Sequence, residues 1–357
     1  MPNNSIGNVS SAVHPEGGLR AWSVVFGAWC AMIPSMGLLN SLGVLQAWIS
    51  THQLKDYSES EVGWIFGAYG FFLFLGGAQF GPILDTYGPE YVILPGSIGM
   101  VISLICFSFS HEYYQIFLSF SVLGGLSACT LFTPTVAVVG HWFNIRRGYA
   151  TGLACTAGGV GGVIIPVIIL FAAPRIGFDW SIRIIALLCV VLLSMACMLL
   201  KTRLPPNKTR SASIDFTALG DIKYASATVA VFLTEFAIFI PITYIASYAV
   251  HVGMSETMSY AIIVFLNLGA IPGRFLPGLL SDRFGRFNIM TLTLFMCFAL
   301  TLAIWLTADM ISPDSLAAII CYAVMFGFWS GASISLAPVC ISHVYETQDY
   351  GKRIGTS

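Results

Sequence analysis

Charged side chains are scarce in this chain of 357 residues. Lys, Arg, Asp and Glu together make up 9% of the residues and hydrophobic residues 57%, whereas a soluble domain carries about 25% charged residues. The formal net charge is −1, so the sequence predicts no nucleic-acid partner. This composition predicts an all-α, polytopic membrane protein in contact with the lipid bilayer.

The sequence also lacks paired cysteines and known catalytic motifs. The nine cysteines are scattered singly, almost all in apolar segments, with no Cys-x-x-Cys or Cys/His spacing, which predicts neither a metal site nor a disulfide framework. No ATP-binding loop or Ser/His dyad is present within the apolar segments. We therefore predict a protein without cofactors that is not an enzyme, and an intramembrane enzyme is the least favoured function class.

Ten apolar stretches follow one another, each long enough to cross a bilayer as a helix. We expect spans near 21–49, 61–84, 91–110, 113–140, 148–172, 180–200, 224–250, 257–280, 287–308 and 315–340. One long connector, 201–223, combines Pro205-Pro206 with Ser, Thr and basic residues, and such a linker indicates a domain boundary. The predicted organisation is a tail at 1–20, a six-helix bundle at 21–200, a linker at 201–223 and a four-helix bundle at 224–357.

The distribution of Lys and Arg predicts a cytoplasmic N-terminus, because short cytoplasmic loops are enriched in positive charge. With that orientation, most of the 16 basic residues lie on the inner side. They are Arg20, Arg146, Arg147, Lys201, Arg203, Lys208, Arg210, Lys223, Arg283, Arg286, Lys352 and Arg353. The outer side holds only Lys55, Arg175 and Arg183, while Arg274 falls within a span. The linker is then cytoplasmic, and we expect the protein in the plasma membrane.

The stretch from Asn267 to Arg286 joins an apolar helix that contains one arginine to a charged turn. Arg274 lies six residues before Leu280, the last apolar residue, which is about 9 Å of helix. A cation at this depth is costly and usually faces a cavity or a partner. The alternative is a side chain that reaches back to the interface.

The charged turn occurs twice in the chain. The repeated residues are Gly81, Asp85 and Gly88 in the first copy and Gly278, Asp282 and Gly285 in the second. Only the second copy carries basic residues, Arg283 and Arg286. The duplication predicts a cytoplasmic latch in which carboxylates and arginines pair between two related halves, and ordinary helix-ending turns are the alternative.

A further basic turn leads into a glycine-rich helix. We expect Arg146 and Arg147 at the cytoplasmic surface, as a membrane anchor and as part of the latch. Gly158 and Gly162 lie one helical turn apart, which allows another helix to approach closely. Helix packing is the favoured interpretation of these glycines, and a hinge or gate is the alternative.

Three stretches resemble the monocarboxylate porter family, in its fungal form, within the major facilitator superfamily. They are Glu16-Gly17-Gly18 before the first span, the run from Trp142 through Arg146-Arg147 to Ala154, and the turn after the eighth span. The resemblance covers the chain from Pro15 onward. It implies two pseudo-symmetric six-helix bundles that rock around a site near the middle of the membrane.

The sequence departs from the family pattern in two ways. The family fold has twelve helices, whereas this sequence has about ten predicted spans. We therefore expect an incomplete fold that stops before the eleventh helix. Well-studied members also place a lysine in the first helix and an aspartate four residues before the arginine, as a proton and substrate relay. Asn40 and Ala270 hold these positions here, which leaves Arg274 as the expected anion-binding residue.

Two more polar residues fall within predicted spans. Asn267 lies on the same helical face as Arg274, so we expect Arg274, Asn40 and Asn267 to bind the substrate, although Asn267 could instead bond a neighbouring helix. Glu235 falls near the middle of its span. It is the candidate for proton coupling, and a hydrogen-bonded packing role is the alternative.

These features favour a secondary active transporter of a small organic solute, in particular a monocarboxylate-like organic anion. Its partners would be that solute, protons and the bilayer. Export of a fungal secondary metabolite by the same fold is the alternative. The second function class is a sensor or a non-transporting remnant, which only the missing helices favour.

Overall fold

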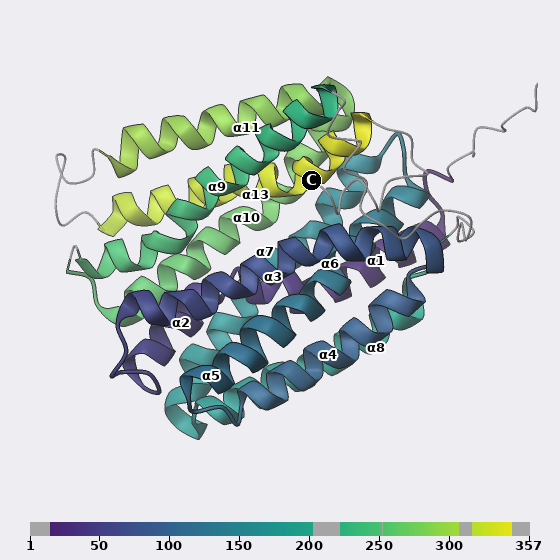
Figure 1. Ribbon diagram of the computed structural model, residues 1–357. Helices are drawn as coiled ribbons and strands as arrows, with labels where there is room; N and C mark the ends of the chain where they lie inside the picture. The colour runs from purple at the N-terminus through teal and green to yellow at the C-terminus, as the bar shows by residue number, and fades with distance from the viewer. Residues whose placement is uncertain (1–14, 203–221, 252, 307–315, 345–357) are drawn as a thin grey trace, which may run out of the picture.

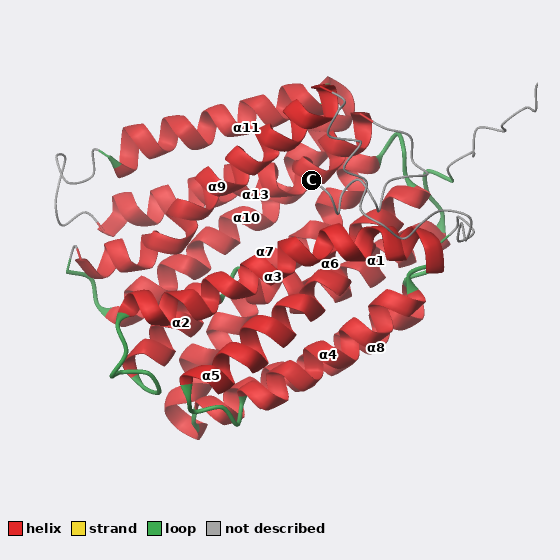
Figure 2. Ribbon diagram, in the orientation of Figure 1, coloured by secondary structure: helices red, strands yellow, loops and turns green. Residues whose placement is uncertain are grey.

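Helices form all the regular structure of the residues described by the computed structural model, which are 15–202, 222–251, 253–306 and 316–344 (Figure 2). The first half contains α1 (Leu19–Met32), η1 (Ile33–Gly37), α2 (Leu42–Thr51), α3 (Glu59–Tyr87), α4 (Glu90–Phe107), α5 (Tyr113–Ile116), η2 (Phe117–Gly124), α6 (Gly125–Trp142), α7 (Arg147–Ile176) and α8 (Phe178–Leu199). The second half contains α9 (Ile222–His251), α10 (Glu256–Phe284), α11 (Arg286–Leu300), η4 (Thr301–Trp305) and α13 (Leu316–Val344).

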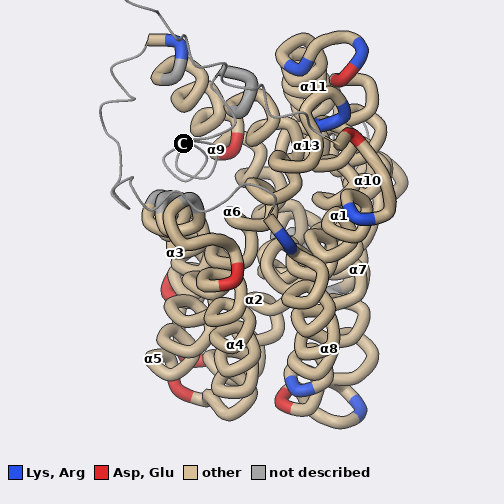
Figure 3. Tube along the Cα trace, turned by 90° about the vertical axis from the view of Figure 1, so that its right-hand side faces the viewer, with Lys and Arg blue, Asp and Glu red and all other residues tan. Residues whose placement is uncertain are grey.

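Nine stretches of the described residues are long and apolar enough to cross a membrane. They are Leu19–Thr51, Glu90–Phe107, Tyr113–Trp142, Arg147–Ile176, Phe178–Leu199, Ala225–Ala246, Met258–Phe284, Arg286–Trp305 and Ala317–Ile341. The helix α3, of 29 residues, covers the remaining predicted span at 61–84. Charged residues lie mostly at the ends of these helices (Figure 3), as expected for an all-α polytopic membrane protein.

The helices form two bundles (Figure 1). The purple to teal helices up to α8 lie together, and the green and yellow helices α9, α10, α11 and α13 lie beside them. The boundaries at 21–200 and 224–357 remain predictions, and most of the predicted linker, 203–221, lies outside the described residues.

The largest contact between the bundles is made by α7 and α10. Glycines line it: a Cβ atom at Gly278 would lie 2.6 Å from the carbonyl oxygen of Gly148 and 3.6 Å from the Cα atom of Gly152. Because backbone meets backbone here, larger side chains would force the two helices apart. This contact fixes how α10, and with it Arg274, sits against the first bundle.

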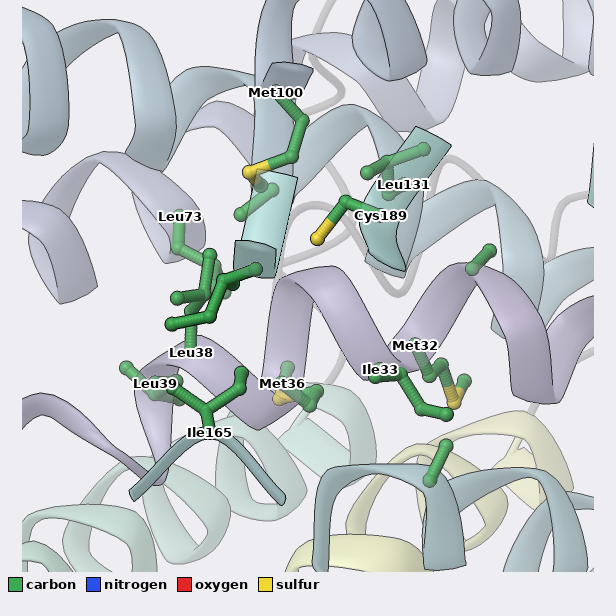
Figure 4. Close-up of a cluster of buried hydrophobic side chains, with 14 of the residues drawn as sticks. Met32, Ile33, Met36, Leu38, Leu39, Leu73, Met100, Leu131, Ile165 and Cys189 are labelled. Carbon is green, nitrogen blue, oxygen red and sulfur yellow. The ribbon is translucent and has the colours of Figure 1, made fainter. Parts of the chain in front are cut away.

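The first membrane helix changes its winding where it enters the core. At Ile33–Gly37 it forms a π-helical turn that includes Pro34, and such turns leave carbonyl groups without their usual helical donors. The hydroxyl of Tyr69 donates to the carbonyl of Ser35 over 3.2 Å. Buried apolar side chains surround the turn, among them Met36, Leu39 and Ile165 (Figure 4).

The two copies of the charged turn end their helices in the same way. Gly88 follows α3 with a φ of 95°, and Gly285 follows α10 with the same φ. Residues with a Cβ atom disfavour this positive φ, whereas glycine adopts it readily. The repeated spacing in the sequence therefore corresponds to a repeated backbone geometry, as in two related halves.

Candidate functional site

Arg274 of α10 lies inside the protein. Its side chain is 2% exposed, and Nη1 donates to the carbonyl oxygen of Cys155 on α7 over 2.7 Å. The Nε atom is buried and has no hydrogen-bond partner among the described residues. Arg274 thus contacts a partner within the protein, while its role in binding an anion stays a prediction.

Asn40 and Arg274 meet at Gly158 of α7. The Nδ2 atom of Asn40 donates to the carbonyl oxygen of Gly158 over 2.9 Å. A Cβ atom at Gly158 would overlap Nη1 of Arg274 and lie 3.1 Å from Nδ2 of Asn40. The missing side chain at this position therefore makes the room that both polar groups occupy.

Asn267 joins the same group of residues. It is 1% exposed, and its Nδ2 atom donates to Ile263 O over 2.9 Å and to Asn40 O over 3.4 Å. A Cβ atom at Gly162 would overlap the amide of Asn267. The structure thus brings together the three residues chosen from the sequence, at the contact between the bundles, and Asn267 also makes the inter-helix bond given as its alternative.

Glu235 of α9 is half-buried and interacts electrostatically with Arg274. Ala270, which holds the position of the family's aspartate, is 3% exposed and packs against Gly331. The carboxylate whose charge acts on Arg274 therefore lies on α9, whereas the family pattern implies one on the same helix as the arginine. Among the described residues, no group of three His, Cys, Asp or Glu side chains could hold a metal ion.

Asp282, at the end of α10, binds the beginning of α7 in the other bundle. Its carboxylate oxygens accept hydrogen bonds from the amides of Gly148 (3.0 Å) and Tyr149 (2.9 Å). The first amides of a helix lack partners within the helix and carry a partial positive charge, which a carboxylate stabilises. Nearby, Nη2 of Arg286 donates to the carbonyl oxygen of Asn144 over 2.7 Å. The second copy of the turn therefore bridges the bundles.

The other residues of the predicted latch are placed differently. Arg283 and Arg146 are exposed, and the side chain of Asp85 lies outside the described part of the chain. Arg147 was expected at the surface, which is wrong: it is 2% exposed. Its guanidinium donates to the carbonyl oxygens of Phe143 and Gly140, each over 3.1 Å, because the last carbonyls of α6 need donors.

Glu16 is a site residue that the sequence reasoning used only as part of a family motif. Its carboxylate accepts from the amides of Asn144 (2.7 Å), Ile145 (2.8 Å) and Arg146 (3.1 Å). The side chain thus fills the turn before α7 from a position 128 to 130 residues earlier in the chain. The family motif drew attention to Glu16, but nothing in the motif indicates that its carboxylate bonds the turn before α7.

Two helix bundles that meet around buried polar residues are typical of secondary transporters. The comparison of the sequence with family models agrees. The chain belongs to the Major Facilitator Superfamily, whose model matches residues 23–356.

Curated relatives of the chain are named as transporters. The chain is 35% identical over 342 residues to MFS-type transporter 1 of Ophiocordyceps sp., an alignment that covers 96% of this chain and 75% of the relative. It is 33% identical to the riboflavin transporter of Saccharomyces cerevisiae, covering 96% and 69%. It is 35% identical to the fujikurins efflux protein of Gibberella fujikuroi, covering 96% and 73%. The protein is therefore a multi-pass transporter of a small molecule, in a superfamily whose members are generally not enzymes.

Proposed function

We propose that the protein is a secondary active transporter that works by alternating access. Its substrate is a small organic anion with a carboxylate group. Arg274 binds the anionic group, and Asn40 and Asn267 line the same site. The N-terminus is cytoplasmic, and the protein resides in the plasma membrane.

The unpaired Nε atom of Arg274 is the observation that supports this proposal most. A guanidinium binds a carboxylate best through two parallel hydrogen bonds, and Nη1 already bonds Cys155. The edge that includes Nε is then the edge available to a ligand. A buried donor without a partner is destabilising, so an anion there stabilises the protein as well as binding to it.

Glu235 is proposed as the group that couples transport to protons. Its electrostatic interaction with Arg274 means that its protonation state changes the field at the anion site. Protonation of Glu235 removes a negative charge that competes with the substrate. This arrangement supports proton-driven uptake of an anion.

Asp282 and Arg286 are proposed as the cytoplasmic latch. They bond the α7 end of the first bundle, so the bonds form only when the bundles are together at this end. The state described here is then closed toward the cytoplasm. The basic residues near this end support its assignment as the cytoplasmic side.

Export of a fungal metabolite is the second candidate. Two observations favour it: a relative is named as an efflux protein, and Asn40 and Ala270 replace the relay pair of the monocarboxylate porters. A sensor or a non-transporting remnant stays the least supported of the proposals, because the relatives are named as transporters.

Uptake of a panel of labelled carboxylates in a transporter-deficient fungal host, with and without a pH gradient, tests the proposal. We expect saturable uptake of at least one carboxylate that rises with an inward proton gradient. Uptake of no carboxylate, together with a lower cell content of a secreted metabolite, would instead support export. Absence of both would contradict transport of an organic anion.

A further inference from the structure

We infer that Glu16 positions the turn before α7 for the inter-bundle latch, so that the segment before the first membrane helix controls the closed state. This role rests on the proposed latch function of Asp282 and Arg286. It goes beyond that proposal because Glu16 belongs to neither of the helices that the latch joins.

One residue, Asn144, links the two sets of bonds. The amide of Asn144 donates to Glu16 over 2.7 Å, while the carbonyl oxygen of the same residue accepts from Arg286 over 2.7 Å. The N–H of Asn144 is thus held by the N-terminal segment, and its C=O is held by the second bundle. The planar peptide group between Asn144 and Ile145 carries that carbonyl oxygen together with the amide of Ile145, which donates to Glu16 over 2.8 Å, so a rotation of this peptide group disturbs both bonds.

Glu16 caps the start of this turn. Arg146, the residue before α7, makes no capping hydrogen bond with its side chain. Glu16 bonds the three amides from Asn144 to Arg146, and Asp282 bonds those of Gly148 and Tyr149, the second and third residues of α7. Two carboxylates from two different parts of the chain therefore share the start of one helix.

The two carboxylates differ in what happens when the bundles separate. Asp282 and Arg286 leave with the second bundle, whereas Glu16 stays, because its segment leads directly into α1 of the first bundle. Without Glu16 the turn would lose its order in the open state and would have to be ordered again at each closure. The conformational entropy lost in that ordering opposes closing. With Glu16 in place, the turn is already arranged for Arg286.

The backbone of the N-terminal segment is built for this contact. Glu16 has a φ of 52° and Gly18 a φ of 90°, both in the region that side chains disfavour. The backbone amide of Glu16 also donates to the carbonyl oxygen of Trp142 over 3.4 Å. Such a conformation persists where surrounding bonds hold it. Here the bonds that hold it are those that Glu16 makes to the turn before α7.

Hydrogen–deuterium exchange of the full chain in lipid nanodiscs tests the inference. In Glu16→Gln, one of the three bonds and the charge are lost, and we expect exchange in 143–150 to accelerate roughly tenfold, as for the loss of about one charge-assisted hydrogen bond. We expect exchange in 278–288, the other side of the latch, to accelerate as well. In an Arg286→Ala background, Glu16→Gln should affect 143–150 only.

Glu61→Gln is the matched control. Glu61 accepts from the amide of Ser58 at the start of α3 over 2.9 Å, away from the latch, so its effect should stay within 58–62. Acceleration confined to 143–150 in the single Glu16→Gln variant would overturn the inference and leave Glu16 as a local helix cap. Unchanged exchange in both segments would overturn it too.

The same experiment separates failure of the inference from failure of the latch. If Arg286→Ala alone changes exchange in neither 143–150 nor 278–288, the proposed latch is wrong and the role of Glu16 falls with it. If Arg286→Ala accelerates both segments but Glu16→Gln does not, only the role of Glu16 is wrong. Glu16→Ala, which removes all three bonds, should give a larger effect than Glu16→Gln.

Discussion

Gly158 faces the guanidinium of Arg274 so closely that a Cβ atom there would overlap Nη1. The glycine is therefore part of the candidate site as well as part of the helix packing. Its carbonyl oxygen also accepts from Asn40, so one residue without a side chain positions two polar groups. Both roles can be tested with a single methyl group.

We expect Gly158→Ala to abolish most transport while the protein still reaches the membrane. The methyl group would displace the Arg274 side chain from Cys155 and leave a buried cation with fewer bonds. Gly67→Ala is the control, because a Cβ atom at Gly67 meets nothing within 4 Å. Substrate uptake and surface expression are the measurements, and normal uptake by Gly158→Ala would contradict the geometry.

Arg274→Lys should lose transport by at least about tenfold. The variant keeps the charge, but a lysine cannot offer two parallel hydrogen bonds to a carboxylate, and about 1.4 kcal/mol corresponds to a factor of ten. The test is uptake by a correctly localised variant, with Arg183→Lys, on the outer side of the predicted topology, as the control. Near-normal uptake would remove Arg274 from the binding site.

Asp282→Asn should favour the state that is open toward the cytoplasm. The neutral side chain can accept only one of the two amide bonds and loses the attraction to the helix N-terminus, a cost of about 1 kcal/mol. Cys155, which is 5% exposed and lies beside Arg274, should then react several-fold faster with a maleimide, as located by mass spectrometry. Asp179→Asn, at the start of α8, is the control, and an unchanged rate at Cys155 would rule out the latch.

Much of the candidate site could be predicted from the sequence because its residues are unusual where they stand. One arginine in an apolar helix and two asparagines in apolar spans are costly unless they have partners, and the structure places Arg274, Asn40 and Asn267 together. The repeated glycine spacing also indicated the related ends of α3 and α10. The predictions for Arg274, Asn267 and the two turns depend on local pattern, whereas Asn40 was chosen because it holds the position of the family's lysine.

The rest depends on contacts that no local pattern contains. Glu16 bonds a turn 128 residues away, and a glutamate in a polar tail looks like any solvated residue. Arg147 is buried because α6 ends beside it and its carbonyls need donors, which the Arg146-Arg147 pair does not indicate. The interaction of Glu235 with Arg274 joins α9 to α10 across the bundle, so the sequence indicated only the depth of Glu235.

Glu235→Gln should flatten the pH dependence of uptake while leaving substrate exchange intact. The variant cannot lose or gain a proton at this position, so the charge opposite Arg274 no longer changes with pH. Uptake and counterflow measured across pH in the same vesicles would check this, with Glu90→Gln, at the exposed start of α4, as the control. An unchanged pH profile would assign Glu235 to packing.

Labelling from outside intact cells should leave a cysteine at Lys201 unmodified, because the predicted topology puts this end of α8 in the cytoplasm. A cysteine at Lys55, before α3, should react. Permeabilised cells provide the control, since both positions should then be labelled. Modification at Lys201 before permeabilisation would reverse the orientation.

The π-helical turn at Ile33–Gly37 lies just before Asn40, the residue of the first membrane helix that bonds Gly158 beside the arginine. A π turn accommodates about one residue more than an α turn, so everything after it is rotated by about 100° relative to an unbroken α-helix. Asn40, three residues after the turn, bonds Gly158 in this register. Deletion of a single residue from the π turn would therefore turn the Asn40 side chain away from the site, although Asn40 itself is unchanged.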